Sequence, residues 1–246
     1  MREEQLERVR RQMMLPEIGS DGQRRLRRAS VLVIGAGGLG SPVLLYLAAA
    51  GVGRIGVMDG DTVSLSNLNR QILFGAEDIG HSKAERAARR LGRMNEEIEV
   101  VAIPAMLDDE NAGKIVDGYT ALALCPDSVS ARRIANRACV KAGVPFAEGA
   151  VHGFAGSLLT VRPGKTACYE CVFGASVPPD GEVPALGAMT GWVGCAEALA
   201  VIRLLLGKPD PAKGTLFCFD GLEMTAEGIP VERDPGCAVC GSFAAG

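Results

Sequence analysis

Short runs of apolar residues alternate with longer amphipathic segments over the first two thirds of the chain. Such short runs predict buried strands, and apolar positions that recur three and four residues apart predict helices. Strands are expected at residues 31–34, 54–58, 98–103, 121–125, 146–150 and 157–161, and helices after residue 41 and at 83–94, 109–116 and 128–142. This alternation predicts an α/β protein with a Rossmann-like, largely parallel sheet and helices on both of its faces.

The two ends of the chain depart from this alternation. Residues 1–15 predict an amphipathic helix, and Pro16, Gly19 and Gly22 are expected to end it. The segment 163–187 is rich in glycine and proline and shows no clear periodicity. Beyond it, a buried helix is expected at 187–206 and additional strands at 214–219 and 224–231.

Composition and charge narrow the possible functions. The 246 residues are 48% hydrophobic, which is enough for a sizeable core. A net charge of −3 and an aromatic content of 4% argue against a general nucleic-acid or membrane-surface binder. No secretory leader opens the chain, so a cytoplasmic location is expected. In that reducing compartment, eight cysteines indicate metal ligands or reactive thiols more than disulfides.

A glycine-rich turn follows the first expected strand. It contains Gly35, Gly37, Gly38 and Gly40. Ser41 and Pro42 then predict a helix N-terminus, as a cap and a first-turn proline. The next strand leads into Asp59, where an acidic side chain can hold ribose hydroxyls. Backbone N–H groups of such a turn bind phosphate, so a nucleotide site is expected, although the glycines do not identify the nucleotide.

Polar side chains gather after the second strand and at the end of the fourth. They are Asp61, Ser66, Asn67, Asn69, Arg70, Lys83 and Asp127. Asp59 and Asp127 follow strands, so both should lie at the carboxyl edge of the sheet, where ligands bind. Arg70 and Lys83 would bring positive charge to phosphates, and Asp127 would hold Mg²⁺. The alternatives are a surface position for Arg70 and a solvated helix-start position for Lys83.

Two CxxC pairs lie far apart in the last third of the chain. They are Cys168 with Cys171 and Cys237 with Cys240. Four thiolates make a closed tetrahedral zinc site, so a structural Zn²⁺ that clamps the C-terminal lobe is expected; redox or uncoordinated thiols are the alternative. The remaining cysteines sit in apolar runs and are expected to be buried and inert.

Together these motifs resemble the bacterial MoeB/ThiF/HesA family, relatives of the adenylation domain of ubiquitin-activating enzymes. The resemblance covers nearly the whole chain. It is carried by Arg11-Gln12, the glycine turn, Asp59-x-Asp61-Thr62-Val63, Ser66-Asn67-Leu68-Asn69-Arg70-Gln71, Gly80-His81-Ser82-Lys83, Asp127 and the two CxxC pairs. A single domain is then expected, with an N-terminal helical arm (1–28), a nucleotide-binding part (29–150) and a part that binds the carrier and zinc (151–246).

The resemblance implies an ATP-dependent adenylyltransferase. Its substrate would be the C-terminal Gly-Gly carboxylate of a small ubiquitin-like sulfur carrier of the MoaD or ThiS type, in molybdopterin, thiamin or related biosynthesis. A homodimer, Mg²⁺ and a structural Zn²⁺ are also implied. ATP would be bound by the glycine turn, Asp59, Asp61, Ser66, Asn67, Leu68, Asn69, Arg70, Lys83, Asp127 and Ser128. Asp127 is implied as the Mg²⁺ ligand and catalytic acidic residue, and Arg11 as a phosphate ligand from the partner subunit.

Three departures from the family pattern carry expectations of their own. Ser128 replaces a frequent asparagine, and its shorter side chain would weaken one nucleotide contact. The chain stops at Gly246 without a rhodanese domain, so a separate sulfur donor is expected. The loop 176–187 contains no cysteine, so adenylation without an obligatory covalent bond between enzyme and carrier is expected.

Two other functions remain open from the residues alone. One is an NAD-dependent oxidoreductase on the same nucleotide-binding fold, which would need no cluster of cations. The other is a non-catalytic scaffold for a ubiquitin-like protein, against which the intact Arg70, Lys83 and Asp127 argue.

Overall fold

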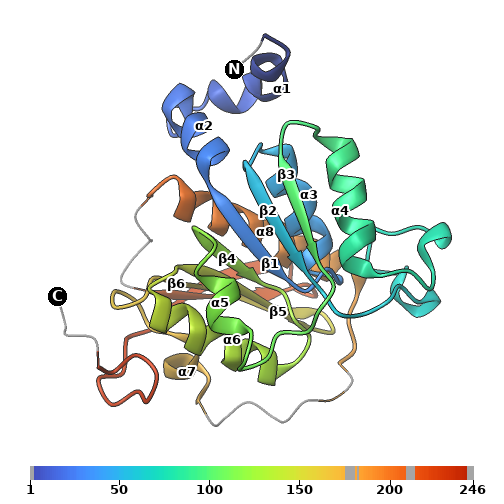
Figure 1. Ribbon diagram of the computed structural model, residues 1–246. Helices are drawn as coiled ribbons and strands as arrows, with labels where there is room; N and C mark the ends of the chain where they lie inside the picture. The colour runs from blue at the N-terminus through green and yellow to red at the C-terminus, as the bar shows by residue number, and fades with distance from the viewer. Residues whose placement is uncertain (1–2, 175–180, 182, 209–213, 243–246) are drawn as a thin grey trace.

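A single mixed sheet runs through the molecule, which was examined as a computed structural model (Figure 1). The structure describes residues 3–174, 181, 183–208 and 214–242. Within them the sheet has eight strands in the order β3-β2-β1-β4-β5-β6-β7-β8. The strands are β1 (Ser30–Ile34), β2 (Arg54–Met58), β3 (Glu99–Ile103), β4 (Ala121–Leu124), β5 (Phe146–His152), β6 (Ala155–Val161), β7 (Thr215–Asp220) and β8 (Thr225–Pro230). Strands β1 to β5 pair in parallel, whereas β5 to β8 pair antiparallel.

Helices cover both faces of the parallel half, as the alternation of strands and helices predicted. The helices of the described residues are α1 (Glu3–Met13), α2 (Gly19–Arg28), α3 (Gly40–Ala49), α4 (Lys83–Met94), α5 (Ala112–Val116), α6 (Val129–Ala142), α7 (Tyr169–Val172) and α8 (Gly187–Leu205), with short 3-10 turns η1 (Leu65–Asn67) and η2 (Ala76–Asp78). Apolar side chains of α3, α4 and α8 form one core cluster with the sheet, and those of α5 and α6 form a second on the opposite face (Figure 1). The predicted α/β fold with a parallel sheet is therefore confirmed.

Helix α8 is central to the first of these clusters. Within the described residues it is the one helix long and apolar enough to cross a membrane. Half of that apolar window is buried inside the molecule, and Val193 and Val201 are fully buried against the sheet. These features are those of a core helix, which was the prediction for residues 187–206.

Helix α1 ends at Met13, before Pro16, as expected, but a second helix that was not predicted, α2, begins at Gly19 and contains Gly22. A Cβ at Gly22 would lie 3.0 Å from the Leu206 side chain, so glycine allows α2 to approach the end of α8 closely. Leu26 of α2 is fully buried. Close packing between helices therefore outweighs the low helix propensity of glycine here.

Helix starts were predicted with mixed success. Ser82 and Ser128 cap α4 and α6, each accepting a backbone N–H on its side-chain oxygen. Helix α3 begins two residues earlier than predicted, at Gly40, so Ser41 lies inside its first turn. The Ser41 hydroxyl donates to the Gly37 carbonyl at 2.7 Å and ties the helix to the glycine turn instead of capping it.

Candidate functional site

Two glycines of the turn between β1 and α3 lie where no side chain would fit. Gly35 has a φ of +93°, and a Cβ there would lie 2.5 Å from the Cys125 carbonyl oxygen. A Cβ at Gly40 would lie 1.9 Å from the Gly35 carbonyl oxygen. These two glycines allow the tight turn, and Gly35, Gly37 and Gly38 line the space above it, which is the arrangement that phosphate binding requires.

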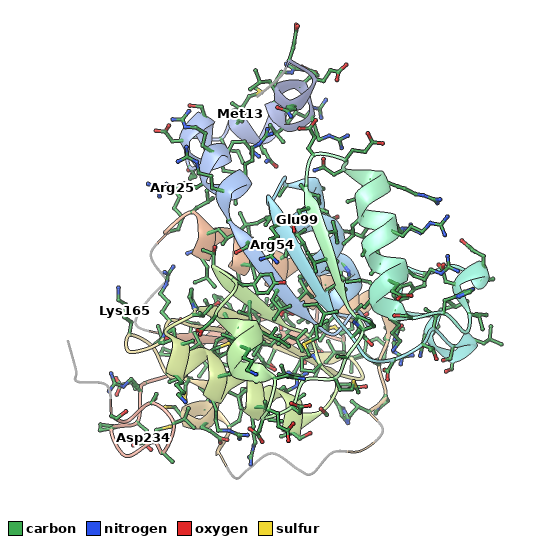
Figure 2. The ribbon with its side chains drawn as sticks, in the orientation of Figure 1. Met13, Arg25, Arg54, Glu99, Lys165 and Asp234 are labelled. Carbon is green, nitrogen blue, oxygen red and sulfur yellow. The ribbon has the colours of Figure 1, made fainter. Side chains whose placement is uncertain are left out.

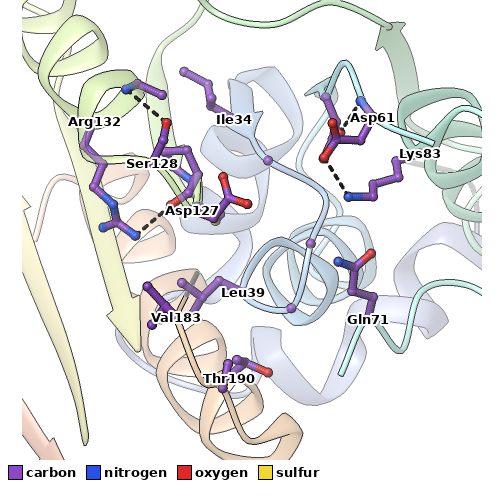
Figure 3. A pocket seen from close by; sticks show the side chains of 18 of the residues that line it. Ile34, Leu39, Asp61, Gln71, Lys83, Asp127, Ser128, Arg132, Val183 and Thr190 are labelled. Atoms are coloured by element: carbon purple, nitrogen blue, oxygen red, sulfur yellow. Dashed lines mark hydrogen bonds and ion pairs between the residues drawn. The ribbon is translucent and has the colours of Figure 1, made fainter. Parts of the chain in front are cut away.

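A cleft of about 620 Å³ opens above this turn, at the carboxyl ends of β1, β2 and β4 (Figure 3). The sheet order changes direction here, because β1 pairs with β2 on one side and with β4 on the other. Ligands of open α/β sheets bind at such a switch point. Ten of the residues proposed from the sequence line the cleft, namely Gly35, Gly37, Gly38, Asp59, Asp61, Asn69, Arg70, Lys83, Asp127 and Ser128.

Asp59 joins the end of β2 to the glycine turn. One carboxylate oxygen accepts the Ala36 N–H at 2.8 Å, and the other accepts the Asp61 N–H at 2.9 Å. Burial raises the pKa of Asp59, and these two donors oppose that rise. Asp59 thus fixes the turn in place, and its carboxylate still borders the cleft.

Lys83 is a buried cation at the edge of the cleft. Its ammonium pairs with the Asp61 carboxylate at 3.0 Å, and its side chain is only 8% exposed (Figure 3). The alternative of a solvated lysine at the start of α4 is therefore wrong. Asp61 lies half exposed beside it, and both side chains line the cleft.

Arg70 lines the same side of the cleft. Its guanidinium donates to the Ser66 carbonyl at 3.0 Å and to the Asn69 side-chain oxygen at 3.1 Å. Both acceptors belong to the short turn around η1, so this turn orients the arginine. Arg70 is partly buried, which does not fit the alternative of a free surface residue.

Asp127 follows β4 and presents an exposed carboxylate to the opposite wall of the cleft (Figure 3). The next residue, Ser128, accepts the Ala131 N–H at 3.3 Å and so caps α6. Serine at this position therefore has a structural role in addition to its place in the cleft lining. Figure 3 shows Lys83 on one side of the cleft and Asp127 on the other.

Five predicted residues lie outside the cleft lining in the described chain, namely Arg11, Gly40, Ser66, Asn67 and Leu68. Gly40 allows the close approach to the Gly35 carbonyl inside the turn. The Asn67 side chain accepts the Ser64 N–H at 3.1 Å beside η1. Arg11 is exposed on α1, at the amino-terminal end of the sheet and away from the cleft (Figures 1 and 2). In one copy of the chain, Arg11 does not join the other cations.

Several lining residues were not predicted from the sequence. Thr190 of α8 is buried, and a Cβ at Gly38 would lie 3.2 Å from its side chain. A hydroxyl residue inside the apolar run 187–206 was the available signal. Arg132 also lines the cleft, but in the sequence it is one of several arginines on an amphipathic helix. Met106 and Val151 supply apolar walls from loops and strand ends.

The four cysteines of the CxxC pairs meet in space. Their sulfur atoms all lie within 4.8 Å of one another, although the two pairs are distant in the sequence. None of them forms a disulfide. The Asp234 N–H donates to the Cys171 sulfur at 3.4 Å, and the Asn136 amide of α6 lies 3.8 Å from the Cys168 sulfur. A donor set of four clustered thiols with outer hydrogen bonds fits a structural Zn²⁺.

Comparisons with known proteins agree with the motifs. The model of the ThiF family matches residues 9–239. The chain is 42% identical over 97% of its length to a sulfur carrier protein adenylyltransferase of Thermus thermophilus, of which it covers 92%. It is 44% identical to the adenylyltransferase and sulfurtransferase MOCS3 of Mus musculus, but covers 52% of that protein, about half its length.

Solved structures give the same assignment at lower identity. The crystal structure of E. coli MccB with ATP superposes with a TM-score of 0.78 at 26% identity, over 89% of this chain and 68% of that one. The fold, the family model and the curated relatives agree with the resemblance inferred from the motifs. The chain therefore belongs to the ThiF family.

Proposed function

We propose that this protein is an ATP-dependent adenylyltransferase that activates the C-terminal Gly-Gly carboxylate of a small ubiquitin-like sulfur carrier of the MoaD or ThiS type. The observation that carries the proposal is the single cleft in which the glycine turn, Arg70, Lys83 and Asp127 converge. Two relatives of the chain are named as adenylyltransferases, one of them of a sulfur carrier protein. Such a cluster of cations around a phosphate-binding turn suits a triphosphate and argues against a nicotinamide cofactor.

The reaction follows from the charges in the cleft. The carrier's terminal carboxylate attacks the α-phosphorus of ATP, an acyl–phosphate bond forms, and pyrophosphate leaves. No general base is required, because a carboxylate is already ionised near neutral pH. Lys83 and Arg70 stabilise the negative charge that accumulates on the phosphates in the transition state. Mg²⁺, when bound with Asp127 as a ligand, would add Lewis-acid stabilisation of those oxygens.

The carrier's tail has a candidate path beside the nucleotide. Val151, Pro184 and Ala185 line the cleft, and the Gly153 N–H donates to the Pro184 carbonyl at 2.7 Å. Two glycines without side chains fit a narrow path between such segments. We also expect the loop 172–186 to close over the tail and the cysteine-free loop 176–187 to form no covalent bond with the carrier; residues 175–180 and 182 of these loops lie outside the described residues.

The remaining parts of the proposal concern the molecule's surroundings. We infer a homodimer in which Arg11 reaches the partner's cleft, and a separate protein as the sulfur donor. The proposed pathway is sulfur transfer in molybdopterin, thiamin or related biosynthesis, with no nucleic-acid or membrane partner. The eight free thiols support a cytoplasmic setting. Residues 29–150 would bind the nucleotide, and residues 151–246 the carrier and zinc.

ATP–pyrophosphate exchange tests the proposal. With a Gly-Gly carrier present, the protein should exchange labelled pyrophosphate into ATP, and Asp127→Ala should lower the exchange rate by at least about 10²-fold while the thermal midpoint stays unchanged. The fold should persist because Asp127 is exposed. Exchange at the original rate in Asp127→Ala would contradict the role of this carboxylate. Activity with nicotinamide and none with ATP would contradict the whole assignment.

A further inference from the structure

Two buried charged side chains lie against the floor of the cleft and have no role in the reaction described so far. Arg132 comes from α6 and is 7% exposed, and Glu148 comes from β5 and is fully buried. They form an ion pair. A charged pair removed from water in this way costs desolvation free energy, and is therefore expected to have a specific role.

Arg132 bridges two strands at the point where they part. The parallel pairing of β4 with β5 ends at Leu124 and Glu148. Beyond that point, one guanidinium nitrogen of Arg132 donates to the Pro126 carbonyl at 2.7 Å and the other to the Gly149 carbonyl at 2.8 Å. The guanidinium thus joins the two chain segments across the gap that their separation leaves.

Glu148 fixes the orientation of this fork. Neither of its carboxylate oxygens has another hydrogen-bond partner among the described residues, so the ion pair with Arg132 accounts for its polar contacts. A guanidinium is planar, and its donors point in fixed directions. Because the Glu148 carboxylate holds one side of the guanidinium, the N–H groups on its other sides point toward the Pro126 and Gly149 carbonyls.

The bridged carbonyl belongs to the peptide unit that carries Asp127. The peptide group between Pro126 and Asp127 is planar, so holding the Pro126 oxygen fixes the plane from which the Asp127 backbone continues. The ring of Pro126 also fixes the φ angle of Pro126 itself, at about −65°. Figure 3 shows the Arg132 guanidinium reaching the backbone beside Asp127, while the Asp127 carboxylate faces the cleft.

We propose that Arg132 is a positioning residue, which holds the Pro126–Asp127 peptide so that the Asp127 carboxylate meets Mg²⁺ and ATP at the correct place. This inference rests on the proposed role of Asp127. A displacement of about 1 Å at a reacting group costs about 10²-fold in rate. Loss of the bridge should therefore weaken the use of Mg²⁺ and ATP in a protein that is still folded.

Two variants separate the bridge from its charge. Arg132→Lys keeps the positive charge opposite Glu148 but cannot donate to both carbonyls as a fixed fork. The double variant R132M/E148L replaces the ion pair with apolar side chains, a change that is often tolerated in protein interiors. The matched control is Arg137→Met on the same helix, since Arg137 is half exposed and pairs only with exposed Asp109 among the described contacts.

The experiment measures exchange rate against Mg²⁺ concentration at fixed ATP, together with the thermal midpoint of each variant. Both Arg132→Lys and R132M/E148L should raise the half-saturating Mg²⁺ concentration by about 10-fold and lower kcat/KM for ATP by about 10²-fold, while Arg137→Met matches the original protein. Folded variants with the original Mg²⁺ dependence would overturn the proposal. The original exchange kinetics in Arg132→Lys would also overturn it, because a positive charge at this position would then be enough to position Asp127.

Asp127→Asn, assayed in parallel, distinguishes the two possible failures. Normal exchange in Asp127→Asn would overturn the role of Asp127 and, with it, the reason for the bridge. Lost exchange in Asp127→Asn beside unchanged Mg²⁺ dependence in both Arg132 variants would overturn the positioning role alone.

Discussion

The pair formed by Lys83 and Asp61 shows how one side chain prepares another for a substrate. Without a partner, a buried ammonium would be costly, and Asp61 offsets that cost while the cleft holds no phosphate. Asp61 was predicted to contact the nucleotide itself. Its geometry in this structure supports a different role, in which it orients Lys83.

Asp61→Asn tests this division of roles. The free energy of unfolding should fall by about 1 kcal/mol, because Asp61 is half exposed and its ion pair is partly screened. That loss corresponds to roughly 3 °C in the thermal midpoint for a chain of this size. Saturating Mg²⁺ and ATP should then raise the midpoint of the variant more than that of the original protein, since phosphate takes over the pairing. Equal shifts by differential scanning fluorimetry would contradict this role.

Glu197 of α8 is a second buried acid, on the other side of the sheet from Glu148. Its carboxylate accepts the Cys125 thiol at 3.4 Å, and burial raises its pKa from 4.5 to about 8. The folded protein therefore keeps this proton over a range in which the unfolded chain has released it. Stability from this group is complete below about pH 4.5 and is lost as the pH rises toward 8.

Glu197→Gln should remove that pH dependence. The difference in unfolding free energy, original protein minus variant, should decrease by about 1.4 kcal/mol per pH unit between roughly pH 5 and 8. Urea unfolding at several pH values measures it. Glu223→Gln, at an exposed position, serves as the control and should follow the original protein. A constant difference between Glu197→Gln and the original protein would show that Glu197 titrates normally.

At the scale of whole elements, α6 connects the cleft to the cysteine cluster. Its first residue follows the Ser128 cap beside Asp127, and its middle carries Asn136, which is fully buried. The Asn136 side chain accepts the Tyr169 N–H at 3.1 Å and places its amide 3.8 Å from the Cys168 sulfur. One helix therefore contacts both sites.

Asn136→Leu should weaken zinc binding without removing a ligand. Loss of an outer hydrogen bond to a metal ligand typically lowers affinity by about 10- to 100-fold. Competition with a chromogenic chelator measures the affinity, and zinc content by mass spectrometry shows whether the site still fills. Lys141→Ala, exposed near the end of the same helix, should leave the affinity unchanged. Equal affinities in both variants would assign Asn136 to packing alone.

The elements also show which parts of the fold could be predicted from the sequence and which could not. Strands and capped helices were predictable because the signals are local: an apolar run before Gly35, or a serine at the start of α4. Helix α2 was missed because the fit of Gly22 against Leu206 depends on a contact distant in the sequence. Arg132 was missed for the same reason, since its partners lie on β5 and at the end of β4.

At the scale of the whole molecule, the cleft of one chain lacks Arg11, the predicted cationic phosphate ligand that lies elsewhere. Helix α1 sits at the amino-terminal end of the sheet, whereas the cleft is at the carboxyl end (Figure 1). Arg11 is exposed on that helix. A second copy related by two-fold symmetry would satisfy the family pattern, because each subunit would then supply Arg11 to the other.

Mixing two inactive variants tests this exchange of residues. Arg11→Ala and Asp127→Asn should each abolish exchange, but a mixed dimer contains one cleft with Asp127 from the first variant and Arg11 from the second. Random assembly of equal amounts should therefore recover about a quarter of the original activity. Mixing Arg11→Ala with the double variant R11A/D127N should recover none, because no cleft then has both residues. Equal results in the two mixtures would mean that Arg11 acts within its own chain or not at all.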